Sequence, residues 1–362
     1  MKIVIAMDSF KGSMTSLEAG NAAKEGILRS CPDAELKVLP LADGGEGTID
    51  AIAPFMECER CELKVRGPLG DPVDSYYLFS KKDRTAYIEM AKASGLTLIP
   101  PEKRNPYEAT TYGTGELIRD AIERGFDRIV IFMGGSATND GGTGMLKALG
   151  CSFKDKDGKE TAAGAIGLKD LHSIDTSSLK GRDIEILAAT DVTSPLCGKD
   201  GASFVYGPQK GASHDMACKM DSWLMSFAKI IDADPFESGT GAAGGLSFAL
   251  RNFLNAKIVS GAELVTETTE LEKHIKDCDI VITGEGKMDG QTLNGKAPFR
   301  VLQLAARYGK PVYGITGTLS DEADALTDAG FSKIIPLTDP EMEKDKAQRS
   351  VSLTLSRIFE KT

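Results

Sequence analysis

Short apolar runs followed by helical periodicity open the chain. The β-branched run at residues 2–7 (KIVIAM) predicts a buried parallel strand, and residues 15–30 repeat apolar positions at helical intervals. Thr15 and Glu18 have the spacing of a capping box, which predicts where that helix begins. A second strand at residues 35–39 then runs into the glycine turn LADGGEGT. This order of strand, loop and helix predicts parallel strands joined by crossover helices.

The same alternation returns near the C-terminus. Strands are predicted at DIVITGEG, PVYGITG and KIIPL, with helices at KAPFRVLQLAARYG and DEADALTDAG and a terminal helix over residues 340–362. Residues 1–70 and 271–362 together therefore predict one discontinuous α/β domain. Its sheet is expected to be parallel and doubly wound, in the Rossmann or flavodoxin manner.

Residues 71–270 have a different pattern. DSYYLF and TAYIEMA alternate like two strands of a hairpin around the charged turn at residues 81–84. A helical pattern follows in TYGTGELIRDAIERG, and the stretches IVIFMGGSATNDGG and IEILAATDV indicate strands that end in polar loops. We therefore predict a second α/β domain here, inserted into the first.

Composition narrows the class of protein. The 362 residues are 41% hydrophobic and 27% charged, which is typical of soluble globular proteins. The net charge of −10 and the lack of a long basic cluster argue against nucleic acid as a partner. No run approaches the roughly 20 apolar residues of a membrane span, and the N-terminal run is too short for a signal peptide. The scattered cysteines favour a reducing cytoplasm.

Five loops place an acidic residue among small or hydroxylic residues directly after an apolar run. They are MDSFKGS, LADGGEGT, MGGSATNDGG, ATDVTSPL and TGEGKMDGQTLNGK. In open parallel sheets, ligands bind at the carboxyl ends of the strands, where glycine-rich turns let backbone amides approach an anion. Carboxylates beside a phosphate require a cation, which points to Mg²⁺, and Lys11 and Lys296 add direct positive charge. Each loop alone is also compatible with a tight corner in which Asp8 or Asp43 holds its own turn.

The common phosphate-binding fingerprints are absent from the sequence. It contains neither a Walker P-loop nor the protein-kinase signature set, and GGSATNDGGTG does not satisfy the dinucleotide pattern G-x-G-x-x-G. Lys210 in GPQKGAS is a further candidate for an anion contact, and the segment GTGAAGGL suits either close backbone packing or a nucleotide wall. The loops therefore predict phosphoryl transfer without a P-loop.

The segments DSFKGSMTSLEA, LADGGEGT, YGTGELI, GGSATNDGGTGMLKALG, ATDVTSPLCG, GASFVYGPQKGAS and VITGEGKMDGQTLNGKAP follow one another along the chain. As a set, they resemble the motifs of the bacterial type I glycerate kinases. The resemblance implies ATP-dependent phosphorylation of D-glycerate with Mg²⁺, to the 2-phosphoglycerate product with which bacterial members are associated. It also implies a Rossmann- or flavodoxin-like domain interrupted by a second α/β domain, with the active site in the interdomain cleft.

This resemblance suggests a role for each candidate residue. Asp191 is the expected general base for the glycerate hydroxyl, while Lys11 and Lys296 neutralise charge on the phosphoryl group or on the substrate carboxylate. The residues expected to hold Mg²⁺ are Asp43, Glu285 and Asp289. The expected contacts to substrate and phosphates are Asp8, Ser9, Lys11, Ser136, Thr138, Asn139, Asp140, Gly141 and Lys210.

Two other functions remain compatible with the same loops. One is a kinase for another small hydroxy acid or sugar acid, or a glycerate kinase that forms 3-phosphoglycerate. These remain open because the motifs indicate phosphate binding more clearly than they indicate which substrate is bound. The other is a nucleotide- or metabolite-binding regulator, against which the density of lysines and carboxylates argues. The expected ligands are small molecules in each case, and the chain is expected to act as a monomer or homodimer.

Overall fold

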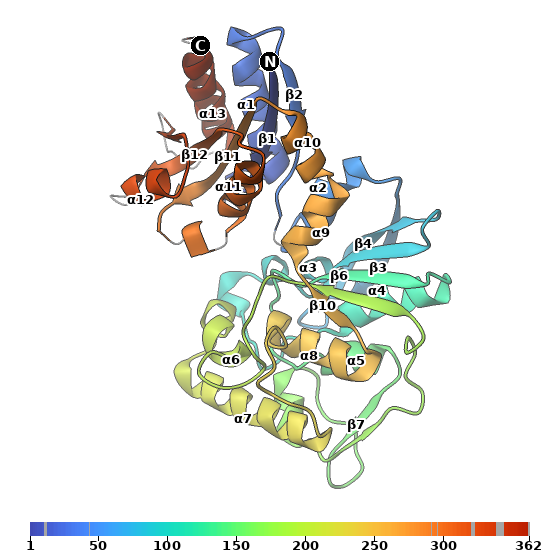
Figure 1. Ribbon diagram of the computed structural model, residues 1–362. Helices are drawn as coiled ribbons and strands as arrows, with labels where there is room; N and C mark the ends of the chain where they lie inside the picture. Colours follow the sequence, from blue (N-terminus) through green and yellow to red (C-terminus); the bar gives the residue numbers. More distant parts are fainter. Residues whose placement is uncertain are drawn as a thin grey trace. The chain divides into compact units, whose positions relative to one another are not determined.

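The computed structural model describes residues 1–10, 13–42, 44–290, 292–294, 296–319, 323–337 and 344–360. The chain forms two compact units (Figure 1). Unit 1 consists of Met1–Asp43, Asp50–Phe55 and Ala262–Thr362, and unit 2 of Gly44–Ile49 and Met56–Gly261. The first unit is thus assembled from segments that lie far apart in the sequence.

The sheet of unit 1 has five strands, in the order β13-β12-β11-β1-β2. All neighbouring pairs are parallel. The strands are β1 (Lys2–Met7), β2 (Glu35–Val38), β11 (Ile280–Met288), β12 (Val312–Leu319) and β13 (Lys333–Pro336). Numbered along the chain within this unit, the order is 2-1-3-4-5, which is the flavodoxin-like doubly wound order. The predicted fold class is confirmed.

Helices cover both faces of this sheet. On one face, α1 (Ser16–Ser30) packs along α13 (Lys344–Phe359), over a core that includes Ile3 and Ile5. On the other face, α10 (Leu271–Asp277) and α11 (Ala297–Arg307) pack over Val4 and Val281. The capping box predicted at the start of α1 is present: Thr15 accepts from the Glu18 amide, and the Glu18 side chain accepts from the Thr15 amide. The shorter helices are α2 (Thr48–Ile52), α9 (Gly261–Thr268) and α12 (Ala323–Asp328).

Unit 2 is built on a six-stranded mixed sheet in the order β10-β9-β6-β5-β4-β3. Its strands are β3 (Glu59–Arg66), β4 (Pro72–Ser80), β5 (Thr85–Glu89), β6 (Arg128–Phe132), β9 (Glu185–Ala189) and β10 (Lys257–Val259). The run from β10 to β5 is parallel, whereas β5, β4 and β3 are antiparallel. The predicted hairpin is therefore confirmed as β4 and β5. Because four strands are parallel, their carboxyl ends meet at one edge of the sheet.

The helices of unit 2 enclose an apolar core that includes Phe227 and Phe248. They are α3 (Ala91–Ser94), α4 (Tyr112–Glu123), α5 (Thr143–Ala148), α6 (Ala202–Tyr206), α7 (His214–Ile230) and α8 (Ala242–Leu254). A small two-stranded sheet of β7 (Ser152–Lys154) and β8 (Ser173–Asp175) completes the unit. No helix in the described part of the chain is both long and apolar enough to cross a membrane.

The unit boundaries differ from those expected from the sequence. Unit 2 takes over at residue 56 rather than at 71, because β3 pairs along its whole length with β4, opposing Cys61 to Tyr77. Unit 1 resumes at Ala262 rather than at residue 271, because α9 belongs to it. Hydrophobic alternation gives a strand's faces but not its partner, so the sequence pattern did not show that residues 59–66 pair within unit 2.

Candidate active site

The topology of unit 1 defines one crevice for a ligand. Along the chain, β2 is added on one side of β1, whereas β12 and β13 are added on the far side of β11. The order of strands therefore reverses between β1 and β11. Open α/β sheets bind ligands at this switch point, beyond the carboxyl ends of the strands. Met7 pairs with Gly284, and the Asp8 amide donates to the Gly284 carbonyl at 2.8 Å. Asp8 and Glu285 therefore stand side by side at the switch point.

Strand alternation gives these carboxylates a common face. Val4 and Ala6 of β1 and Val281 of β11 lie in the core beneath α10 and α11. Because side chains alternate between the two faces of a strand, Asp8 points to the same face as Ala6, and Glu285 to the same face as Val281. The helix α11 packs on that face, and Lys296, the residue before it, contacts Glu285. Of the strand-end loops singled out in the sequence, the structure thus places Asp8 of MDSFKGS beside Glu285 of TGEGKMDGQTLNGK.

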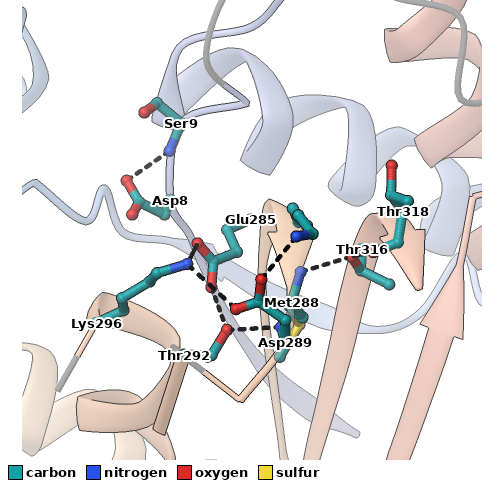
Figure 2. Close-up of polar contacts among 10 residues, drawn as sticks. Asp8, Ser9, Glu285, Met288, Asp289, Thr292, Lys296, Thr316 and Thr318 are labelled. Atoms are coloured by element: carbon teal, nitrogen blue, oxygen red, sulfur yellow. Dashed lines mark hydrogen bonds and ion pairs between the residues drawn. The ribbon is translucent and has the colours of Figure 1, made fainter. Parts of the chain in front are cut away.

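Lys296, which directly precedes α11, faces two carboxylates (Figure 2). Its ammonium lies 3.2 Å from Glu285 Oε2 and 3.9 Å from Asp289 Oδ1. Both acidic residues are only 8% exposed, whereas the Lys296 side chain is 37% exposed, so the carboxylates are poorly solvated and the ammonium is partly solvated. Lys287 also contacts Asp289, at 2.9 Å, but from a largely exposed position. Lys296 is thus the more shielded of the two cations.

Threonines that the sequence analysis did not single out hold this cluster in place. Thr292 Oγ1 donates to Glu285 Oε1 at 2.7 Å and accepts from the Asp289 amide at 3.1 Å. From β12, Thr316 Oγ1 accepts from the Met288 amide at 3.0 Å. Both threonines are fully buried. Thr292 could have been noticed as the hydroxylic residue inside MDGQTLNGK, whereas Thr316 carries no local signal.

The residues of this cluster suit a phosphate accompanied by Mg²⁺. Mg²⁺ in phosphate sites is usually held by one or two carboxylates, with water and phosphate oxygens completing its shell. Glu285 and Asp289 supply such a pair, and the described residues contain no group of three His, Cys, Asp or Glu able to hold a metal alone. The positive end of the α11 dipole also favours an anion, although Pro298 has no amide hydrogen and the Phe299 and Arg300 amides donate to the Lys296 carbonyl. The predicted residues Lys11 and Asp43 lie outside the described part of the chain.

At the parallel edge of unit 2, Asp191 follows β9 and Ser260 follows β10. Ser260 Oγ donates to Asp191 Oδ1 at 2.6 Å. At this length the two side chains form a close hydrogen bond. Both side chains are partly accessible. Asp191 therefore occupies the kind of strand-end position at which a general base was expected.

Lys210, which the sequence suggested as a possible anion contact, is held inside the protein. It is 2% exposed, and its ammonium donates to Ser136 Oγ at 2.8 Å and to the Thr138 carbonyl at 2.7 Å. Burial lowers the pKa of Lys210 to about 7, and the nearby charge of Asp140 opposes this shift. Lys210 thus cross-links the loop that follows β6 instead of pointing into solvent.

Asp140 and Gly141 also act inside the loop. Asp140 is fully buried and accepts from the Thr111 amide at 2.8 Å, from Thr111 Oγ1 at 2.9 Å and from the Gly142 amide at 3.0 Å. Burial raises the pKa of Asp140, against the effect of these hydrogen bonds. The Gly141 amide donates to the Gly244 carbonyl at 3.0 Å. Contrary to the sequence-based expectation, the Asp140 carboxylate and the Gly141 amide form hydrogen bonds within the protein.

The remaining polar side chains of this loop are turned inward. Asn139 Nδ2 donates to Ser203 Oγ at 2.8 Å, and both Thr138 and Asn139 are fully buried. Asn139 Oδ1 is buried without a hydrogen-bond partner among the described residues. Ser136, bonded to Lys210, is 6% exposed. The structure thus brings the predicted loop residues together, but mainly as a packed support.

A buried carboxylate missed by the sequence analysis anchors the LADGGEGT turn. Glu89, at the end of β5, is fully buried and accepts from the Gly47 amide at 2.9 Å and from the Ile49 amide at 3.3 Å. The Gly134 amide donates to the Gly44 carbonyl at 3.0 Å, which ties the same turn to the end of β6. An acidic residue inside the apolar run TAYIEMA was the available signal. These contacts add residues 44–49 to the polar edge of unit 2.

Comparison with known proteins now bears on this arrangement. The family model described as "Glycerate kinase family" matches residues 3–362. The chain belongs to the glycerate kinase family. It is 45% identical to the Escherichia coli glycerate 2-kinase, covering 92% of this chain and 90% of the relative. A glycerate kinase of Halalkalibacterium halodurans is 44% identical, with 96% of this chain and 93% of the relative covered.

A solved structure supports the same assignment. The crystal structure from Salmonella typhimurium whose description names glycerate kinase 2 has a TM-score of 0.85 and 43% sequence identity, covering all of this chain and 98% of that one. The family resemblance inferred from the motifs is therefore confirmed, and the chain is an enzyme of the kinase class.

Proposed function

We propose that this enzyme transfers the γ-phosphoryl group of ATP to D-glycerate, with Mg²⁺, and forms 2-phosphoglycerate. The observation that carries the proposal is the cluster of Lys296, Glu285 and Asp289 at the switch point of unit 1. A cation flanked by two carboxylates at a helix start is suited to a metal-bound polyphosphate. The product assignment draws on the name of the Escherichia coli relative, glycerate 2-kinase.

In this proposal, unit 1 neutralises the charge of the phosphates. Lys296, at the positive end of the α11 dipole, binds phosphate oxygens, and Asp8 and Ser9 line the same strand ends. Glu285 and Asp289 hold Mg²⁺. The metal, when bound, supplies positive charge that stabilises the charge developing on the transferred group. From the sequence alone, Lys11 is added to the residues that bind phosphate and Asp43 to those that hold Mg²⁺.

Asp191 is proposed to act on the glycerate hydroxyl. The hydroxyl oxygen attacks the γ-phosphorus in line, forming a new O–P bond while the bond from phosphorus to the ADP oxygen breaks. The hydroxyl proton passes to the Asp191 carboxylate, and the electron pair of the broken bond leaves on ADP. The packed loop of residues 136–141 gives the substrate a rigid wall, because its own polar groups are mostly satisfied within the protein.

The product and the substrate can be tested together. Purified enzyme with ATP and Mg²⁺ is expected to release ADP when D-glycerate is added, and phosphorus NMR is expected to show 2-phosphoglycerate. A signal from 3-phosphoglycerate would correct the position of transfer. Faster ADP release with glycolate, tartronate or gluconate would replace the substrate. ATP binding without ADP release from any of these acids would instead favour a regulator.

Asp191→Asn tests the proposed base. The amide keeps the size and can still accept from Ser260, but it cannot take up a proton. We expect kcat to fall roughly 10²–10⁴-fold, the usual contribution of a general base, with KM for ATP within about two-fold. The measurement is steady-state ADP release over a range of ATP and glycerate concentrations. Near-normal turnover would remove Asp191 from this role.

A further inference from the structure

The ends of β9 and β10 fix the backbone on both sides of the Asp191–Ser260 hydrogen bond. Ala189 pairs with Val259, and the Thr190 amide donates to the Val259 carbonyl at 2.9 Å, so the ladder continues beyond the last strand residue. Ser260 follows immediately. Its 2.6 Å contact to Asp191 Oδ1 therefore joins two residues whose main chains are already held in register.

A glycine turn packs directly beside this pair. Gly44 has φ of +82°, and a Cβ built there would lie 3.0 Å from the Ala189 carbonyl oxygen and 3.3 Å from Gly261 Cα. The close approach leaves no room for a side chain between the end of β9 and the residue after Ser260. The backbone on both sides of Ser260 is thus held, by the Val259 ladder before it and by the contact of Gly261 with this turn after it.

We propose that Ser260 is a positioning residue for Asp191. By bonding Oδ1, it fixes the plane of the carboxylate and hence the direction in which Oδ2 points when the glycerate proton is transferred. In-line transfer is sensitive to such orientation, since an error of about 1 Å can cost about 10²-fold in rate. The inference deepens the proposed function and rests on the base role of Asp191.

A role of Ser260 as a helix cap alone must be distinguished from its role in positioning Asp191. Ser260 directly precedes α9, at the position where serine commonly caps a helix by accepting a backbone amide. Glycine is nearly as good as serine at such a cap, whereas alanine is clearly worse. Only the hydroxyl-bearing residues, serine and threonine, can also donate to Asp191. Substitutions therefore distinguish capping from positioning.

The test compares three single variants of the full-length enzyme in the glycerate-dependent ADP-release assay. If Ser260 positions Asp191, Ser260→Ala and Ser260→Gly both lower kcat by roughly ten-fold, the rate equivalent of a lost hydrogen bond to a charged group. KM for ATP and glycerate stays within about two-fold, and Ser260→Thr restores most of kcat. A capping role alone predicts that Ser260→Gly is near normal and only Ser260→Ala is impaired, and this result would overturn the proposal.

A double-mutant cycle shows whether the effect passes through Asp191. In the Asp191→Asn background, Ser260→Ala is expected to change the residual rate by less than about two-fold, because there is no longer a base to orient. An equal loss in both backgrounds would overturn the positioning role while leaving the proposed function intact. Normal turnover of Asp191→Asn itself would remove the base. Lack of glycerate-dependent ADP release by the unmodified enzyme would instead show that the proposed function has failed.

Discussion

Lys296→Met is expected to lower kcat for glycerate phosphorylation by roughly 10²–10³-fold, the cost of removing one preorganised group that stabilises transition-state charge. The ammonium of Lys296 is held 3.2 Å from Glu285 by ion pairing, in a place where the carboxylates are 8% exposed. Poor solvation strengthens its interaction with a developing phosphoryl charge. Methionine keeps most of the volume of the stem but carries no charge.

The same substitution should not weaken Mg²⁺ binding. Without Lys296, Glu285 loses the cation that competes with a metal for its oxygens, while Asp289 keeps its ion pair with Lys287. We therefore expect the Mg²⁺ concentration that gives half-maximal rate to stay equal or fall, measured by titrating Mg²⁺ at saturating ATP. A higher Mg²⁺ requirement would mean that Lys296 organises the metal site rather than the phosphoryl group.

Lys287→Met is the matched control for Lys296→Met. Lys287 pairs with the same Asp289, at 2.9 Å, but its side chain is 62% exposed. Exposed ion pairs contribute little, so kcat is expected to stay within about three-fold of the unmodified enzyme. Equal losses in the two variants would show that general charge around Asp289, and not the placement of Lys296 before α11, determines the rate.

The parallel sheet and the convergence of its strand ends could be predicted because both follow from local pattern. An apolar run that stops at Asp8 indicates a buried strand and its end, and parallel strands bring such ends to one edge; β11, by contrast, continues past Glu285 to Met288. The capping box at Thr15 is a similarly local signal. Threonines such as Thr316 escaped notice because their partners lie on other strands.

The inward orientation of the loop after β6 could not be read from its own residues. GGSATNDGG has the composition of an anion-binding turn, and its burial comes from segments distant in sequence. Lys210 reaches Thr138 from one side, and on the other a Cβ at Gly244 would lie 2.0 Å from the Thr138 carbonyl oxygen. Ala243, Gly244 and Gly245 all have positive φ there, which supports the packing interpretation of GTGAAGGL. Such close approach depends on tertiary placement, not on pattern.

Lys210→Met is expected to remove a pH-dependent part of the stability of unit 2. The pKa of Lys210 is lowered from 10.5 to about 7 by burial, so between these values the unfolded chain binds a proton that the folded chain has released. The free energy of unfolding therefore rises with pH across this window, by up to about 1.4 kcal/mol per pH unit. Below pH 7 both states are protonated and the contribution no longer changes.

The single tryptophan allows this to be measured on unit 2 itself, because Trp223 lies on α7 and packs 5.1 Å from the ring of Tyr107. Urea unfolding followed by Trp223 fluorescence at pH 6, 7, 8 and 9 should give a stability difference between the unmodified enzyme and Lys210→Met that grows by about 2 kcal/mol from pH 7 to pH 9. Lys219→Met, on the exposed side of α7, removes the same formal charge and should leave the pH dependence unchanged. A constant difference across this range would mean that Lys210 stays charged in its buried place, so that its bonds to Ser136 and Thr138 offset the cost of burial.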